Sequence, residues 1–130
     1  MRFMLFMLPN IETGGGDFTP TAEAVAEMTK YNQELEKSGV LLEAEGLHSQ
    51  EEGARVTHER GKVTVIDGPF TEAKEAIGGY WMIQAKSKEE AIEWAKRVPS
   101  VQGDPFTIEV RPVFDMEEFP PDVQAAAQRS

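Results

Sequence analysis

Near its N-terminus the chain reads RFMLFML over Arg2–Leu8. Apolar side chains occupy both alternating sets of positions, which is typical of a strand that is covered on both of its faces. Such a strand is usually a central strand of its sheet. The sequence therefore predicts a fold built around this strand, with the later elements beside it or packed against it.

A β-α-β unit is predicted outward from this strand. Helical spacing of apolar residues indicates a helix over Pro20–Ser38, with Thr19 as its N-cap. Gly39 supplies the C-terminal stop, and a second strand runs over Val40–Leu47, with Val40, Leu42 and Ala44 on one face. The inner stripe of the helix is predicted to hold Val25, Met28, Tyr31 or Asn32, and Leu35.

A second β-α-β unit is predicted in the C-terminal half. Its strands are Ile77–Lys86 and Thr107–Phe114. Between them Ser87 and Glu90 form a capping box that opens a helix. Pro112 cannot donate to a ladder, which favours an edge position for the last strand. The inner face of the helix is predicted to carry Ala91, Trp94, Ala95 and Val98.

A hairpin separates the two units. Two short alternating runs, Ala54–Glu59 and Lys62–Asp67, flank Arg60-Gly61, and glycine there can adopt positive φ. The predicted fold class is α+β, with two helices on one face of a mostly antiparallel sheet. Residues 1–114 are predicted to form a single domain, and 115–130 an acidic tail that either holds a short helix after Pro121 or is frayed.

The second face of this sheet has no helix to cover it. Either Phe3, Leu5 and Met7 or Met4, Phe6 and Leu8 lie on that face, and an apolar face of this size needs a partner. We expect a second copy of the chain, joined by a two-fold contact between sheets. The alternative is that the hairpin and the tail cover the face within one chain.

Composition excludes several classes of partner. The chain has 130 residues, with 23 Asp and Glu against 13 Lys and Arg, for a net charge of −10. This charge argues against nucleic acid and anionic membranes as partners. The absence of cysteine excludes disulfides and thiolate chemistry, and fits a cytoplasmic location. The apolar run near the N-terminus lacks the cleavage site of a signal peptide.

Four segments carry a family resemblance. They are DGPFTEAKEAIGGYWMI from residue 67, EAEGL from 43, EEAIEWAKRVP from 89 and EVRPV from 109. Together they resemble the DGPF-type branch of the YCII-related domain family. The resemblance implies a ferredoxin-like β-α-β-β-α-β fold with a hairpin insert, assembled as a dimeric α+β barrel. The wider superfamily includes lactone isomerases, cofactor-free monooxygenases and lyases acting on small aromatic or lactone compounds.

The chain departs from one pattern of that family. The YCII branch is similar to proteins with a histidine on the first helix, paired with an aspartate as an acid/base dyad. The matching stretch here reads Glu27-Met28-Thr29 and contains no histidine. The DGPF branch itself largely lacks an assigned activity. Some of its members resemble accessory proteins encoded near alternative sigma factors, which implies a stress or regulatory setting.

Two residues are candidates for acid/base catalysis, Asp67 and His48. Asp67 ends a strand before Gly-Pro, so it is either an Asx-turn that accepts backbone N–H bonds or a base at the mouth of a cleft. His48 follows the strand that contains Glu45, and is either a surface residue or a proton-transfer group. His58 lies in the hairpin and is expected to face solvent.

A second group is predicted to line a ligand site. Tyr80 and Trp81 point to opposite faces of the sheet, so one packs under the helices and the other faces the site; the alternative is that both belong to the core. Arg111 shares a pleat face with Glu109, which favours an ion pair; the alternative is an anchor for a carboxylate or phenolate ligand. The predicted ligand-binding residues are Phe70, Tyr80, Arg111 and Glu45.

Neither a metal nor an organic cofactor is expected. The two histidines have no helical metal spacing, and Gly14-Gly15-Gly16 lacks the pattern of a phosphate loop. The sequence predicts a small-molecule-binding protein, or a cofactor-free enzyme that acts on a small aromatic or lactone compound by acid/base chemistry. The alternative is a non-catalytic acidic dimer that binds a basic protein, in a regulatory role linked to sigma-factor-type stress responses.

Overall fold

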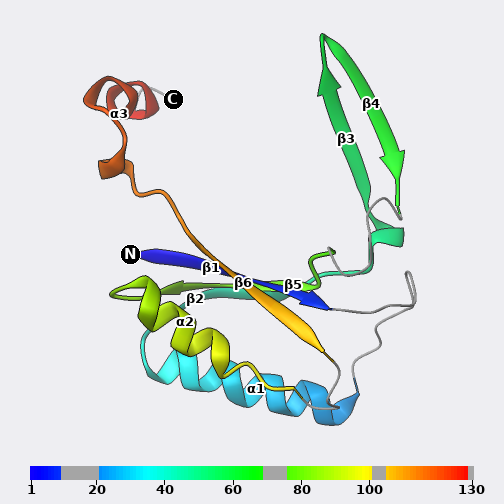
Figure 1. The fold of residues 1–130 in the computed structure, drawn as a ribbon, viewed down its shortest axis with the longest axis vertical. Helices are drawn as coiled ribbons and strands as arrows, with labels where there is room; N and C mark the ends of the chain where they lie inside the picture. The colour runs from blue at the N-terminus through cyan, green and yellow to red at the C-terminus, as the bar shows by residue number, and fades with distance from the viewer. Residues whose placement is uncertain (10–20, 69–75, 101–104, 129–130) are drawn as a thin grey trace.

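The computed structural model describes residues 1–9, 21–68, 76–100 and 105–128 (Figure 1). It is an α+β fold, in which two helices lie on one face of a four-stranded antiparallel sheet. The strand order is β2-β5-β1-β6, which is compatible with a ferredoxin-like α+β fold. The flanking of β1 by β5 and β6 confirms the central position predicted for Arg2–Leu8.

The predicted strands and the two predicted helices are all present, with small shifts at their ends. A further helix lies near the C-terminus, which decides between the two alternatives left open for the tail, a short helix and a frayed end. In chain order the elements are β1 (Arg2–Pro9), α1 (Ala22–Lys37), β2 (Leu41–Gly46), η1 (Gln50–Glu52), β3 (Ala54–Glu59), β4 (Lys62–Asp67), β5 (Gly79–Gln84), α2 (Lys88–Lys96), β6 (Phe106–Pro112), η3 (Met116–Glu118) and α3 (Pro121–Gln128).

The first helix begins later than predicted. Its N-cap is Thr21, whose hydroxyl accepts the N–H of Ala24 at 3.1 Å, while the predicted cap, Thr19, lies outside the described residues. Gly39 ends the helix with a φ of 74°, as expected. The predicted inner stripe is wrong at Val25, which is 50% exposed because the buried face of α1 begins one turn later.

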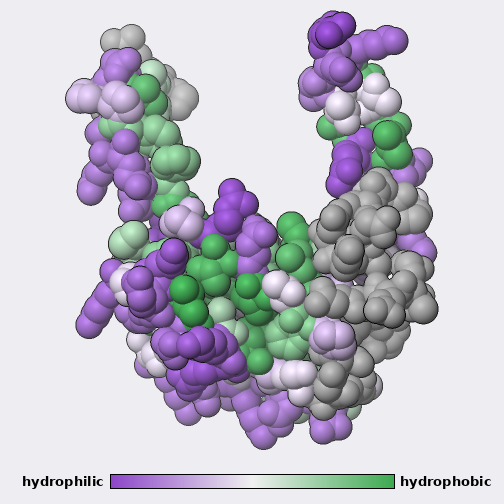
Figure 2. Space-filling model, in the orientation of Figure 1, coloured by the Kyte–Doolittle hydropathy of each residue, from purple (hydrophilic) through white to green (hydrophobic). Residues whose placement is uncertain are grey.

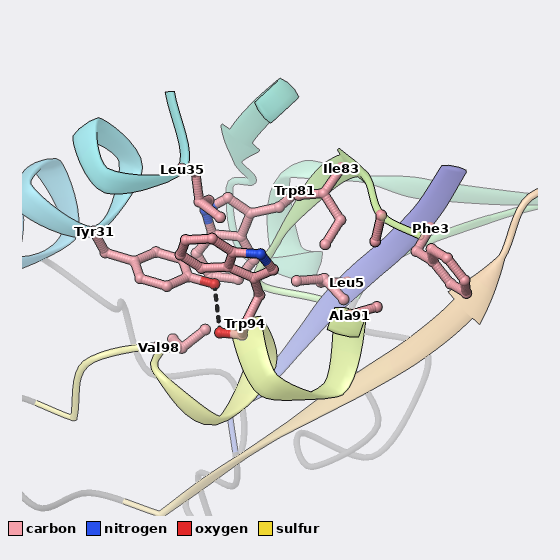
Figure 3. Packing of buried hydrophobic residues seen from close by; sticks show 10 residues of the cluster. Phe3, Leu5, Tyr31, Leu35, Trp81, Ile83, Ala91, Trp94 and Val98 are labelled. Atoms are coloured by element: carbon pink, nitrogen blue, oxygen red, sulfur yellow. Dashed lines mark hydrogen bonds between the residues drawn. The ribbon is translucent and has the colours of Figure 1, made fainter. Parts of the chain in front are cut away.

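The core lies between the two helices and the inner face of the sheet (Figure 3). The hydroxyl of Tyr31 donates to the carbonyl oxygen of Trp94 at 2.7 Å, which ties α1 to α2. Trp81 meets the edge of the Tyr31 ring and donates its Nε1–H to Asn32 at 2.7 Å. The polar atoms that enter this core are therefore paired. The buried side chains are Phe3, Leu5, Tyr31, Leu35, Trp81, Ile83, Ala85, Ala91, Trp94 and Val98.

A β-bulge changes the predicted faces of β2. The register with β5 shifts between Leu41 and Glu43, so Leu41 and Ala44 pack toward the core. Leu42, which was predicted to share a face with Ala44, is 47% exposed. The bulge leaves Glu43 opposite Met82 on the next strand.

Two arms rise from the sheet on the side opposite the helices (Figure 1). One is the hairpin β3–β4, whose turn has positive φ at both Arg60 and Gly61, as a two-residue type I′ turn requires. The other is the C-terminal segment that follows β6 and ends in α3. The arms do not fold down onto the sheet. None of the helices in the described residues is long and apolar enough to cross a membrane.

Candidate functional site

The helix-free face of the four-stranded sheet is the candidate site. Cross-strand register sets two rows of side chains on it. The middle of each row is mainly apolar and the ends are charged, so the face is an apolar band between two polar edges. The first row holds Glu43, Met82, Met4 and Arg111, and the second holds Glu45, Tyr80, Phe6 and Glu109.

The polar edge along β2 is built around a phenol. Trp81 faces the core and its neighbour Tyr80 faces the helix-free side, which confirms the predicted alternation. Desolvation is the main cause that raises the pKa of Tyr80. Glu43 raises it further, both by its negative charge and by a hydrogen bond between its carboxylate and the Tyr80 hydroxyl, and the charge of Glu45 adds to the effect. Tyr80 is therefore a protonated hydrogen-bond donor at neutral pH, with two carboxylates beside it.

The polar edge along β6 is an ion pair. Arg111 lies 3.3 Å from Glu109, and both side chains are largely exposed, which confirms the ion pair predicted for them. Three strand spacings separate β2 from β6, about 14 Å in all. A small aromatic ligand is shorter than that distance. Arg111 and Glu45 therefore belong to opposite edges of the face, and a ligand that contacts both relies on the reach of the two side chains.

The two catalytic candidates lie outside these rows. Asp67 ends β4 in the separate hairpin sheet, and His48 follows β2 on the way to η1. Both side chains are exposed, and neither forms a hydrogen bond or ion pair with another described residue. Their segments meet at the base of the hairpin, where the N–H of Gly68 donates to Gly53 at 3.0 Å. Phe70 lies outside the described residues.

A hollow on α1 is a poor alternative site. It encloses about 450 Å³, opens widely to solvent and is lined by Gln33, Glu36 and Lys37. Ligand sites are concave and mostly apolar, whereas this lining consists of long polar side chains. Among the described residues, no three His, Asp or Glu side chains gather as metal ligands would. The helix-free face remains the best candidate.

The sequence comparisons identify the family of the chain. Residues 1–117 match the YCII-related domain, a span that includes all four strands of the sheet and both helices beneath it. The chain belongs to the YCII-related domain family. A relative from Rhizobium meliloti (strain 1021), "Uncharacterized protein R00369", is 35% identical over 60 residues. That match covers 46% of this chain and 48% of the relative, about half its length.

One residue of the candidate site in this YCII-related domain was not among the residues predicted from the sequence. Glu43 hydrogen-bonds Tyr80, although only Glu45 was predicted to bind ligand. Alternation along the strand does place Glu43 and Glu45 on one face. The missing information was the neighbour of β2, because only strand pairing shows that both carboxylates stand beside Tyr80.

Proposed function

We propose that this YCII-related domain binds a small organic molecule over the helix-free face of its sheet. The observation that carries the proposal is the row formed by Glu45, Tyr80 and Phe6, in which a carboxylate and a phenol adjoin an apolar ring. Small-molecule sites combine a mainly apolar lining with a few placed polar groups. Met4 and Met82 extend the apolar lining with side chains that adapt to different shapes.

The proposal includes a cover for this face. A flat surface buries little of a ligand, and known sites bury most of it. We take the four-stranded sheet to be the ferredoxin-like half of a dimeric α+β barrel, in which a second copy closes the face. The resemblance to the DGPF-type branch supports this arrangement, and so does the mainly apolar middle of the face.

Charge along the β2 edge selects the ligand. Glu43 and Glu45 repel an anion, while Tyr80 offers a donor to a carbonyl oxygen. A neutral aromatic or lactone compound with a carbonyl group and a hydroxyl group fits this edge better than an aromatic acid does. An acid would have to bind at Arg111, in competition with Glu109.

The same edge supports acid/base chemistry without a cofactor. In this proposal Tyr80 donates a hydrogen bond to the carbonyl oxygen of the ligand, and Glu45 accepts a proton from the adjacent carbon or hydroxyl. The acid/base roles predicted for Asp67 and His48 stay a prediction. They apply to a ligand that extends beyond β2 toward the base of the hairpin.

Calorimetric titration with two probes of opposite character tests the proposal. We expect 7-hydroxycoumarin, a neutral aromatic lactone at mildly acidic pH, to bind, and benzoate to bind more weakly. Tyr80→Phe and Glu45→Gln should each weaken binding of the lactone about tenfold, the effect of one lost hydrogen bond. Glu36→Gln, which removes a carboxylate from the far side of the molecule, should have no effect. Equal binding to all four proteins would refute the assigned site.

A further inference from the structure

Two aromatic rings lie next to each other on the helix-free face. Phe6 and Tyr80 are direct partners in the register of β1 and β5. The N–H of Ala85 donates to the carbonyl oxygen of Met1 at 2.9 Å, and hydrogen-bonded pairs alternate with non-hydrogen-bonded pairs along an antiparallel ladder. Phe6 and Tyr80 are therefore a non-hydrogen-bonded pair, in which the Cα atoms are about 4.5 Å apart and the side chains approach most closely. The two rings form one aromatic surface.

Carboxylates border this aromatic surface on both sides. Along the second row Glu45 lies at one end and Glu109 at the other. Glu43, in the first row, shares a hydrogen bond with the hydroxyl of Tyr80. Arg111 lies 3.3 Å from Glu109 and neutralises it. Glu43 and Glu45 form no ion pair with any residue that the structure describes.

The β2 edge therefore carries two negative charges that lack a counter-charge. Glu43 and Glu45 are two residues apart on one face of the strand, so their charges repel each other. A cation between them removes this repulsion and gains charge-assisted hydrogen bonds to both carboxylates. The face of an aromatic ring is negative and attracts the same cation. The carboxylates and the rings thus favour one kind of ligand group.

We infer that the ligand of the proposed site is an organic cation, namely an aromatic compound with an ammonium group on a short side chain. The inference rests on the proposed function and specifies the charge of its ligand. The aromatic ring of the ligand packs on Phe6, Met4 and Met82. Its ammonium group lies between Glu43 and Glu45, where it supplies the missing counter-charge.

The dimensions of the face agree with such a ligand. The midpoint between β5 and β1, where the two rings lie, is one and a half strand spacings, or about 7 Å, from β2. A two-carbon chain between ring and nitrogen spans most of this distance, and an N–H···O hydrogen bond spans the rest. In Figure 2 hydrophobic residues gather in the middle of the molecule, where the strands of this sheet lie in Figure 1, with hydrophilic residues around them. The ring of the ligand therefore belongs over the middle of the sheet, and its charged group at the edge.

Ligands of one shape are expected to differ in affinity according to their charge. The β2 edge repels an aromatic acid, and a neutral compound gains only apolar contacts and ordinary hydrogen bonds. An ammonium compound gains two ion pairs in addition. The whole chain has a net charge of −10, which attracts any cation weakly and at no particular place. A test must therefore separate the effect of Glu43 and Glu45 from that of net charge.

Calorimetric titration at pH 7 with three phenols of similar shape makes this separation. Tyramine carries an ammonium group, 4-ethylphenol is neutral and 3-(4-hydroxyphenyl)propanoate is an anion. The test variant is Glu43→Gln with Glu45→Gln. The control variant, Glu36→Gln with Glu89→Gln, loses the same charge from exposed positions on α1 and α2. Circular dichroism verifies that both variants are folded.

We expect tyramine to bind the wild type and the control at least about tenfold more tightly than 4-ethylphenol does, and the propanoate to bind most weakly. In the test variant the ratio of the tyramine and 4-ethylphenol affinities should fall to about one, because no unpaired carboxylate remains at the β2 edge. A ratio taken within one protein cancels any effect of the substitutions on the shared phenol. Phe6→Leu should lower the ratio about threefold, since it removes a ring but keeps an apolar contact.

Equal binding of tyramine and 4-ethylphenol to the wild type would overturn the inference. So would a preference for tyramine that persists in the test variant, or one that the control loses to the same extent. If 7-hydroxycoumarin nevertheless binds in a manner that depends on Tyr80 and Glu45, the proposed function stands without the cation. If neither tyramine nor 7-hydroxycoumarin binds, both proposals fail. Tyramine binding that requires Glu43 and Glu45, without binding of the coumarin, supports the cation and refutes the neutral lactone.

Discussion

The substitution Tyr31→Phe tests how the two helices are joined. It removes a buried hydroxyl that donates to the carbonyl oxygen of Trp94 at 2.7 Å and leaves the ring against Trp81. That carbonyl also accepts the N–H of Arg97 at 3.1 Å, so it keeps a partner. We therefore expect the free energy of unfolding to fall by about 1 kcal/mol at neutral pH, the net value of one hydrogen bond, and not by the larger cost of an orphaned group.

Alkaline pH provides a second and more specific readout. Burial raises the pKa of Tyr31 well above its ordinary value; nearby Arg97 partly offsets this effect and Glu34 adds to it. In the unfolded chain the phenol ionises near pH 10, so its contribution to stability is intact below that pH and is lost above it. The loss approaches about 1.4 kcal/mol for each pH unit above pH 10 until the folded pKa is reached, and it totals about 2.7 kcal/mol at pH 12 relative to neutral pH.

In the variant, the lost hydrogen bond lowers the free energy of unfolding at every pH, whereas removal of the ionisable phenol prevents the loss of stability at alkaline pH. Tyr31→Phe should be the less stable protein at pH 7 and the more stable one at pH 12, with the two stability curves crossing roughly one unit above pH 10. Urea unfolding followed by tryptophan fluorescence at pH 7, 10, 11 and 12 measures the difference, in which groups common to both proteins cancel. A gap that stays constant across this range would refute the buried, neutral state assigned to Tyr31.

Three further substitutions test the core, a helix cap and a close contact, each by urea unfolding. Leu35→Ala empties a fully buried position on α1 and should cost about 2–5 kcal/mol. Ser87→Ala removes the hydroxyl that accepts the N–H of Glu90 at 3.2 Å and should cost about 0.5–2 kcal/mol; an unchanged urea midpoint would count against the cap. Gly68→Ala puts a Cβ onto the carbonyl oxygen of Gln50 and should cost more than about 1 kcal/mol, whereas Gly46→Ala, with open space around it, should differ from wild type by less than about 0.5 kcal/mol.

Local chemistry accounts for the elements that were predicted correctly. The doubly apolar run Arg2–Leu8 became the central strand, and Ser87 caps α2 as predicted, although Glu90 accepts the N–H of Lys86 and not that of Ser87. Arg60-Gly61 formed the hairpin turn, and Pro112 lies on the edge strand β6. Each of these signals acts within a few residues, through side-chain alternation, a capping hydrogen bond or the φ angle that a turn needs.

The errors arose where a distant part of the chain decided the outcome. The inner stripe of α1 was predicted from spacing alone, but Val25 lies beyond the surface that the sheet offers to the helix. The bulge in β2 is a matter of register with β5, so the exposure of Leu42 could not be inferred from alternation along one strand. The propensity and apolar periodicity of a segment depend on that segment alone, whereas strand register depends on two paired strands.

In the candidate site, too, some features follow from the local sequence and others only from the pairing of strands. Residue types and alternation were enough to select Tyr80, Glu45 and Arg111, to separate Tyr80 from Trp81 and to pair Arg111 with Glu109. Strand order was needed to place Glu43 and Glu45 beside Tyr80 and to leave Arg111 about 14 Å away at the other edge. The residues of one chain acquire a shared chemistry only when pairing between strands makes them neighbours. The sequence therefore identified most of the polar groups of the candidate site, and pairing between the strands decided which of them are neighbours.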